Sequence, residues 1–148
     1  FPTDLKDSLG NLLRQKGNEF GATTNRPRRC GWLDLVILKY AIRINGIDKM
    51  VITKLDVLDN IDEIKVCTGY KYKNEILEEF PQDQRIFEKC KPLYKVLPGW
   101  KACTYGLTKL EKLPQTARKY LDYIQEKLET KIFLISTGNK REETIILD

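Results

Sequence analysis

The sequence predicts an α/β fold in which helices flank a mostly parallel sheet, with an antiparallel segment around residues 62–97. Two patterns lead to this prediction. Helix-like and strand-like stretches alternate near both ends of the chain, which is typical of α/β proteins. Between them, apolar and polar residues alternate with period two, which indicates a half-exposed strand. The 148 residues, 41% apolar and 32% charged, suit one domain or a large piece of one.

The N-terminal quarter of the chain predicts two helices. Thr3 or Asp4 is a candidate N-cap for the first, in which leucines recur at helical spacing: Leu5, Leu9, Leu12 and Leu13. The second is expected from Trp32, with Asp34 in its first turn and Asn45-Gly46 as its C-cap. Because this helix would directly follow a basic loop, its free N–H groups should face any anion that the loop holds.

The middle of the chain predicts three strands. Residues 50–53 have the pattern of a short buried strand, and residues 64–73 that of a half-exposed one. Residues 93–97 suggest another strand, and the mixed stretch 74–92 contains one possible short helix.

The C-terminal part predicts a helix followed by a strand. Pro114 fits the first turn of a helix with a periodic apolar face: Ala117, Leu121, Ile124 and Leu128. Residues 132–135 then read as a short apolar strand. In α/β sheets, ligands bind outside the carboxyl ends of the strands. Two polar triplets follow predicted strands and are therefore candidate binding elements: Lys54-Leu55-Asp56 and Ser136-Thr137-Gly138.

The most distinctive stretch is the arginine loop, Gly21-Ala-Thr-Thr-Asn-Arg-Pro-Arg-Arg-Cys-Gly31. Its arginines offer planar forks of N–H groups suited to carboxylate or phosphate, and its threonines add hydroxyls. Asn25 tolerates a positive φ, and the glycines at both ends leave the backbone free to wrap a ligand. The loop predicts an anion-binding site, with a solvated basic surface as the alternative.

The stretch Thr53-Lys-Leu-Asp56 has the form of the guanine-reading element of GTP-binding proteins. The carboxylate of Asp56 can accept both the N1 proton and the exocyclic amine of guanine, and the stem of Lys54 can lie across the base. Backbone N–H groups of residues 136–138 could reach the guanine O6. A polar turn after a strand is the alternative reading, and the chain has no Gly-x-x-x-x-Gly-Lys-[Ser/Thr] phosphate loop.

The amino-acid composition excludes some kinds of catalytic and metal site. The chain has no histidine, which removes any Ser–His or Cys–His nucleophile pair. Its four cysteines are widely spaced, so buried free thiols are expected rather than a zinc site: Cys30, Cys67, Cys90 and Cys103. The formal net charge of +5 favours anionic partners, and no apolar run is long enough to span a membrane.

Five blocks, in this order, resemble the family of adenylosuccinate synthetases: Gly17-Asn-Glu-Phe-Gly-Ala-Thr-Thr-Asn-Arg-Pro-Arg-Arg-Cys-Gly-Trp-Leu-Asp34, Ile52-Thr-Lys-Leu-Asp-Val-Leu-Asp59, Leu97-Pro-Gly-Trp100, Leu113-Pro-Gln-Thr-Ala117 and Ile135-Ser-Thr-Gly138. The resemblance implies that residues 1–148 are the C-terminal portion of a ligase, including the C-terminal part of its sheet. The ligase would join IMP and L-aspartate to adenylosuccinate with GTP and magnesium. It would be a cytoplasmic homodimer with small-molecule substrates and no nucleic-acid or membrane partner.

The resemblance also implies a role for each matched position. The arginine loop would bind aspartate, through Ala22, Thr23, Thr24, Asn25, Arg26, Pro27 and Arg28. Arg26 is similar to the arginine that contacts IMP, and Arg28 to one that also reaches the GTP phosphate. The elements 53–56 and 136–138 would bind the guanine, through Lys54, Leu55, Asp56, Ser136, Thr137 and Gly138. Arg29 receives no role.

Two positions depart from the family pattern, and one part of it is missing. Asn25 stands where glycine is common, and Pro27 where another basic residue is usual. No position matches the family's catalytic aspartate, its catalytic histidine or its glycine-rich phosphate loop. We therefore expect no catalytic or metal-binding residue here, magnesium bound by a missing N-terminal part, and no activity of this portion alone.

Two other functions stay open at this level. A GTP-binding module without ligase activity would bind nucleotide, although the phosphate loop is missing. A basic nucleic-acid-binding module would need wide basic patches interleaved with exposed aromatics. Charges of both signs are instead spread along the sequence, which counts against that function.

Overall fold

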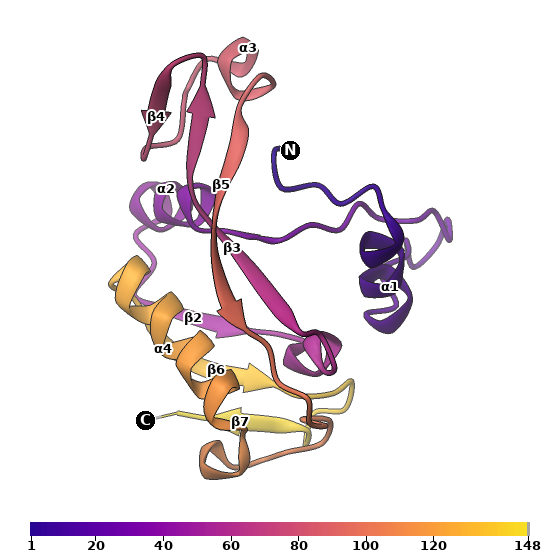
Figure 1. Cartoon of the computed structure of the whole chain (residues 1–148). Coiled ribbons are helices and arrows are strands. Elements are labelled where there is room, and N and C mark those ends of the chain that lie inside the picture. The colour runs from indigo at the N-terminus through magenta and orange to yellow at the C-terminus, as the bar shows by residue number, and fades with distance from the viewer. Residues whose placement is uncertain (148) are drawn as a thin grey trace. The chain divides into compact units, whose positions relative to one another are not determined.

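A computed structural model describes residues 1–147 of the chain (Figure 1). The chain divides into two compact units. The first comprises residues 1–40 and 65–96, and the second comprises residues 41–64 and those from 97 onward. Helices accompany a sheet with both parallel and antiparallel pairs in each unit, which confirms the α/β prediction.

The first helix, α1 (Ser8–Lys16), begins later than the sequence suggested. Its N-cap is Asp7, whose carboxylate accepts the N–H three residues along at 3.0 Å. The prediction of Thr3 or Asp4 as the cap was wrong, because Thr3 lies in a turn and Asp4 in an isolated bridge, both ahead of the helix. Asp4 pairs with Gly31 in an antiparallel bridge, and the carbonyl of Thr3 accepts the N–H of Trp32 at 3.2 Å.

The second helix, α2 (Leu35–Asn45), follows a short strand, β1 (Leu33–Asp34). Asp34 lies before the helix and not in its first turn. Its Oδ1 accepts two N–H groups of that turn, at 3.1 and 3.2 Å. The expectation that these N–H groups face an anion held by the loop was therefore wrong. Gly46, at φ +60°, confirms the predicted C-cap.

The strand β3 (Glu63–Tyr72) is the centre of the first sheet. It pairs in parallel with β1, antiparallel with β4 (Glu75–Leu77), and also with β5 (Lys91–Pro98). The predicted strands at 64–73 and 93–97 are thus confirmed, and so is a short helix in the mixed stretch, α3 (Gln84–Phe87). The three-residue β4 was not predicted.

The core of the first unit combines one buried polar pair with an aromatic cluster. The hydroxyl of Tyr70, fully buried, donates to Oδ2 of Asp34 at 2.7 Å. Burial raises the pKa of Asp34 above its ordinary value, whereas the bond from Tyr70 lowers it. Phe80 stacks on Tyr40 with ring centroids 4.8 Å apart and lies 5.0 Å from the ring of Phe87. The Asp34–Tyr70 pair therefore links the start of α2 to β3.

The second unit is a three-stranded sheet with one long helix. Strand β2 (Lys49–Ile52) runs parallel to β6 (Lys131–Ser136), and β6 pairs antiparallel with β7 (Thr144–Ile146). Helix α4 (Gln115–Leu128) lies along this sheet (Figure 1). Its predicted apolar residues are all buried: Ala117, Leu121, Ile124 and Leu128. The prediction of a buried β2 was wrong, because its residues alternate between exposed and half-buried.

The cysteines are free thiols, and two of them match the expected burial. Cys67 and Cys90 are buried, Cys30 is half-buried and Cys103 is exposed. Burial raises the pKa of Cys67 to about 12, so this thiol stays protonated at neutral pH. Among the helices of residues 1–147, none combines the length and the apolar character that a membrane crossing requires.

Candidate functional site

The arginine loop, in the first unit, is a closed turn. Phe20 and Pro27 form an antiparallel bridge at its base. Inside it, the N–H of Gly21 donates to the carbonyl of Arg26 at 2.9 Å, and the N–H of Asn25 donates to the carbonyl of Gly21 at 2.8 Å. Asn25 has φ +52°, which confirms the left-handed conformation that the sequence allowed. The side chains of this turn therefore project from a defined backbone.

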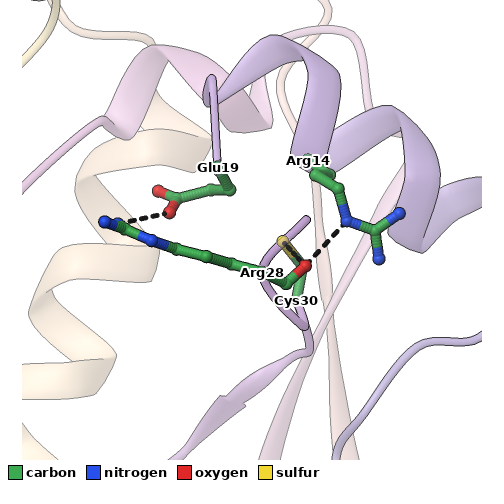
Figure 2. Close-up of polar contacts among 4 residues, drawn as sticks. All are labelled: Arg14, Glu19, Arg28 and Cys30. Atoms are coloured by element: carbon green, nitrogen blue, oxygen red, sulfur yellow. Dashed lines mark hydrogen bonds and ion pairs between the residues drawn. The ribbon is translucent and has the colours of Figure 1, made fainter. Parts of the chain in front are cut away.

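Arg28 is fixed through its backbone while its guanidinium stays accessible. Its carbonyl accepts Nε of Arg14 at 2.7 Å and the thiol of Cys30 at 3.9 Å, and Figure 2 shows Arg14 reaching this carbonyl from α1. The Arg28 guanidinium pairs with Glu19 at 3.2 Å, and the two side chains are 57% and 27% exposed. An exposed pair of this kind contributes roughly 0–1 kcal/mol. An incoming carboxylate can therefore replace Glu19 at little cost.

Arg29 and Arg26 differ in their surroundings. Arg29 donates from Nε and from a terminal nitrogen to Oδ2 of Asp4, at 3.0 and 2.7 Å, and lies 4.9 Å from the centre of the Phe1 ring. The hydrogen bond from Arg29 holds the pKa of Asp4 below its ordinary value. Within residues 1–147, the side chain of Arg26 has no hydrogen-bond or ion-pair partner. Arg29 thus holds the base of the loop, whereas Arg26 is available to a ligand.

The glycines at the ends of the loop serve packing. A Cβ at Gly31 would clash with the carbonyl of Thr3, and one at Gly21 would come within 2.7 Å of the Thr24 hydroxyl. Neither glycine has a positive φ. The small size of Gly31 is therefore required by neighbouring backbone, and that of Gly21 leaves room for the Thr24 hydroxyl. The role of both glycines in wrapping a ligand stays a prediction.

The two predicted guanine elements are brought together in the second unit. Lys54, which has φ +58°, lies two residues after the end of β2 and directly precedes a 3-10 helix at residues 55–58. Its N–H donates to the hydroxyl of Ser136 at 2.9 Å, across 82 positions of sequence. Leu55 is only 1% exposed, so its side chain is a core residue and only its backbone could meet a ligand.

Asp56 has a buried carboxylate oxygen whose hydrogen-bonding capacity is not satisfied. Its Oδ1 is buried and has no hydrogen-bond partner among the described residues. Burial raises the pKa of this carboxyl, and a hydrogen bond from the residue's own backbone N–H lowers it. The negative charges of Asp59 and Glu143 raise the pKa, and the charge of Lys54 lowers it. A buried acceptor without a donor costs free energy, so such an atom is normally satisfied by a ligand or by water. Oδ1 of Asp56 is therefore a candidate acceptor for a ligand's hydrogen-bond donor.

The turn between β6 and β7 holds residues that the sequence did not single out. The carboxylate of Glu143 accepts the N–H of Lys140 at 2.9 Å and a hydrogen bond from the hydroxyl of Tyr105. That carboxylate occupies the space where Gly138 would otherwise carry a Cβ. No sequence signal marks Glu143, because the adjacent Glu142 is of the same type yet exposed.

The structure thus groups the candidate residues into two sets. The elements 53–56 and 136–138 adjoin one another in the second unit, and the arginine loop belongs to the first unit. In the part of the chain that the structure describes, no group of three or more histidine, cysteine or acidic side chains could hold a metal ion.

Comparison with known proteins gives a consistent answer along the whole chain. The family model described as adenylosuccinate synthetase matches residues 1–145. The adenylosuccinate synthetase of Thermodesulfovibrio yellowstonii is 57% identical over 146 residues, and that of Desulforamulus reducens is 53% identical over 148. A solved structure of fully ligated adenylosuccinate synthetase from Plasmodium falciparum superposes with a TM-score of 0.96 at 40% identity.

The matches cover nearly all of this chain but only part of each relative. They include 99% and 100% of the chain in the two bacterial comparisons, and 34% and 35% of those relatives. In the structural comparison they include all of this chain and 36% of the Plasmodium protein. The chain therefore spans about a third of the length of the proteins that it matches.

Proposed function

The chain belongs to the adenylosuccinate synthetase family, and from this premise we propose that it supplies substrate contacts to an IMP–aspartate ligase. That ligase forms adenylosuccinate from IMP and L-aspartate while GTP is converted to GDP and phosphate. Residues 1–148 are the C-terminal portion of its domain. The observation that carries the proposal is the buried Oδ1 of Asp56, which has no hydrogen-bond partner among the described residues.

The guanine of GTP binds between the elements 53–56 and 136–138. Asp56 accepts the N1 proton and the exocyclic amine of the base, which satisfies its buried oxygen. The stem of Lys54 lies along the face of the base, and its ammonium helps to keep Asp56 ionised. The base oxygen accepts N–H groups of the backbone at residues 136–138. Adenine presents no N1 proton and no 2-amine, so Asp56 selects guanine.

The arginine loop binds L-aspartate. Arg28 holds a substrate carboxylate and also reaches the GTP phosphate, while Thr23 and Thr24 donate hydroxyl hydrogen bonds. Arg26 contacts IMP, since its guanidinium has no partner among residues 1–147. Ala22, Asn25 and Pro27 shape the turn, whose Asn25 already adopts the required positive φ.

The reaction itself depends on groups outside this chain. The family implies magnesium, and residues 1–147 contain no group of three or more histidine, cysteine or acidic side chains that could hold a metal ion. As part of the proposal, the ion is bound by the N-terminal part of the ligase. The chain alone is accordingly inactive. The complete ligase is a cytoplasmic homodimer.

The experiment that tests this function replaces Asp56 by Asn in the intact enzyme and compares GTP with XTP. Xanthine has a 2-oxo acceptor where guanine has an amine, and an asparagine amide can donate to it. We expect the kcat/KM for GTP to fall by about 100-fold, since guanine loses its two charge-assisted bonds to the carboxylate. The kcat/KM for XTP should rise, since the 2-oxo group of xanthine gains a bond from the new amide.

The matched control for this test is Asp62→Asn in the same unit. Asp62 forms only an exposed pair with Lys101, at 2.8 Å, with side chains 76% and 79% exposed. The control should keep wild-type preference for GTP. An Asp56→Asn enzyme that still prefers GTP as strongly as the wild type would contradict the guanine assignment.

A further inference from the structure

In the turn that joins β6 to β7, the backbone N–H groups differ in whether they have a hydrogen-bond acceptor. Three of its four N–H groups at positions 137–140 are accepted by one residue, Glu143. The carbonyl of Glu143 accepts the N–H of Thr137 at 3.0 Å, and its carboxylate accepts those of Lys140, at 2.9 Å, and Asn139. Within the described residues, the N–H of Gly138 has no acceptor.

We propose that Glu143 is a positioning residue for guanine recognition, because it occupies the neighbouring donors and leaves the N–H of Gly138 to meet the base oxygen. This inference rests on the proposed GTP site. Glu143 itself is 9% exposed, and its hydrogen bonds go to backbone N–H groups of the turn. It therefore acts by positioning that backbone and does not contact the base. The missing side chain of Gly138 makes room for the carboxylate, and any Cβ there would clash with it.

Two further contacts hold this arrangement next to Asp56. The hydroxyl of Thr137 donates to the carbonyl of Leu107 at 2.7 Å, which ties the turn to the preceding loop. The hydroxyl of Tyr105, from that same loop, lies 3.4 Å from Oδ1 of Asn139 and close enough to the carboxylate of Glu143 to lower the pKa of that carboxyl. The N–H of Lys54 donates to the hydroxyl of Ser136 at 2.9 Å, which links the elements 53–56 and 136–138. One ligand can therefore meet both the donor at Gly138 and the acceptor at Asp56.

The arrangement predicts which part of the base Glu143 controls. A backbone N–H selects a purine with an oxygen at C6 and disfavours one with an amine there, because two donors would then oppose each other. GTP and ITP both carry the 6-oxygen, whereas ATP carries a 6-amine. Glu143 should therefore affect GTP and ITP equally, in contrast to Asp56, which also reads the 2-amine that ITP lacks.

The test compares Glu143→Gln with the matched control Glu142→Gln in the intact enzyme. The new amide can accept one of the two N–H groups, but its own NH₂ opposes the other, so the turn should shift. We expect KM for GTP and for ITP to rise by the same factor, about tenfold, with the preference for GTP over ATP reduced accordingly. The kcat and the KM for aspartate should not change. Tyr105→Phe should act in the same direction with a smaller factor.

Several outcomes would overturn the inference. An unchanged KM for GTP in Glu143→Gln, or an equal loss in Glu142→Gln, would do so. A lower kcat with raised KM values for all substrates and a lower Tm would show a role in folding only. Asp56→Asn, measured in parallel, separates the two levels: if it weakens GTP and Glu143→Gln does not, the positioning role fails while the GTP site stands. If neither variant affects GTP, the proposed site itself fails.

Discussion

Replacing Arg28 by Leu separates binding from folding in the arginine loop. Arg28 contributes to folding through its backbone, whose carbonyl accepts Nε of Arg14 at 2.7 Å, and the substitution leaves that bond in place. Its side chain forms only the exposed pair with Glu19, worth about 0.5 kcal/mol for pairs of this type. We therefore expect the Tm of the intact enzyme to change by no more than about 2 °C.

The effect of Arg28→Leu on aspartate should be far larger. A guanidinium that binds a carboxylate makes two charge-assisted hydrogen bonds, each worth about 1.5 kcal/mol when compared with solvation by water. Their loss amounts to about 3 kcal/mol, which corresponds to roughly a 100-fold increase in the KM for aspartate. The KM for GTP should rise as well, by a smaller factor, if the same side chain reaches the nucleotide phosphate.

Steady-state kinetics with aspartate varied, paired with thermal unfolding, is the appropriate assay. Arg29→Leu is the matched control, because Arg29 is an adjacent arginine that already binds Asp4 through two nitrogens, at 3.0 and 2.7 Å. It should lower the Tm more than Arg28→Leu while raising the KM for aspartate only a few-fold. An unchanged aspartate KM in Arg28→Leu, or a larger effect in Arg29→Leu, would refute the assignment.

Two buried hydrogen-bond networks give stability predictions for the intact enzyme. Tyr70→Phe should cost about 2 kcal/mol at pH 7, since it removes a bond to the carboxylate of Asp34. That bond lowers the pKa of Asp34, so chemical denaturation should show a smaller cost once the pH falls below the raised pKa of this carboxyl, where the folded state holds it protonated; a cost independent of pH would contradict this. Asp59→Ala leaves buried donors of Trp100 and Thr104 without the carboxylate that accepts them at 2.6 to 2.8 Å. It should cost about 3 kcal/mol, and a stability within 1 kcal/mol of wild type in a urea titration would be inconsistent with that network.

Local backbone chemistry was predictable where it depends on neighbours in sequence. The positive φ of Asn25 and of Gly46 follows from residue type, and the apolar period of 117–128 defined the inner face of α4. The errors concern features that depend on pairing with distant residues. Asp34 was expected inside its helix, but it belongs to β1, where it pairs with Cys67 of β3. Strand β7 exists because it pairs with β6, and its three residues give no period of their own.

The sequence by itself determined the kind of chemistry: arginines and threonines on one loop, a carboxylate and a lysine after one strand, and their order along the chain. Only the tertiary structure decided which members of each kind are available. The side chain of Arg29 is bound by Asp4 and that of Arg26 has no partner among residues 1–147, although both are arginines of one loop. Glu143 is enclosed by its turn while Glu142 is exposed. Identical side chains differ only in the partners that folding brings to them, because burial and hydrogen bonding, not residue type, set what a charged group is free to bind.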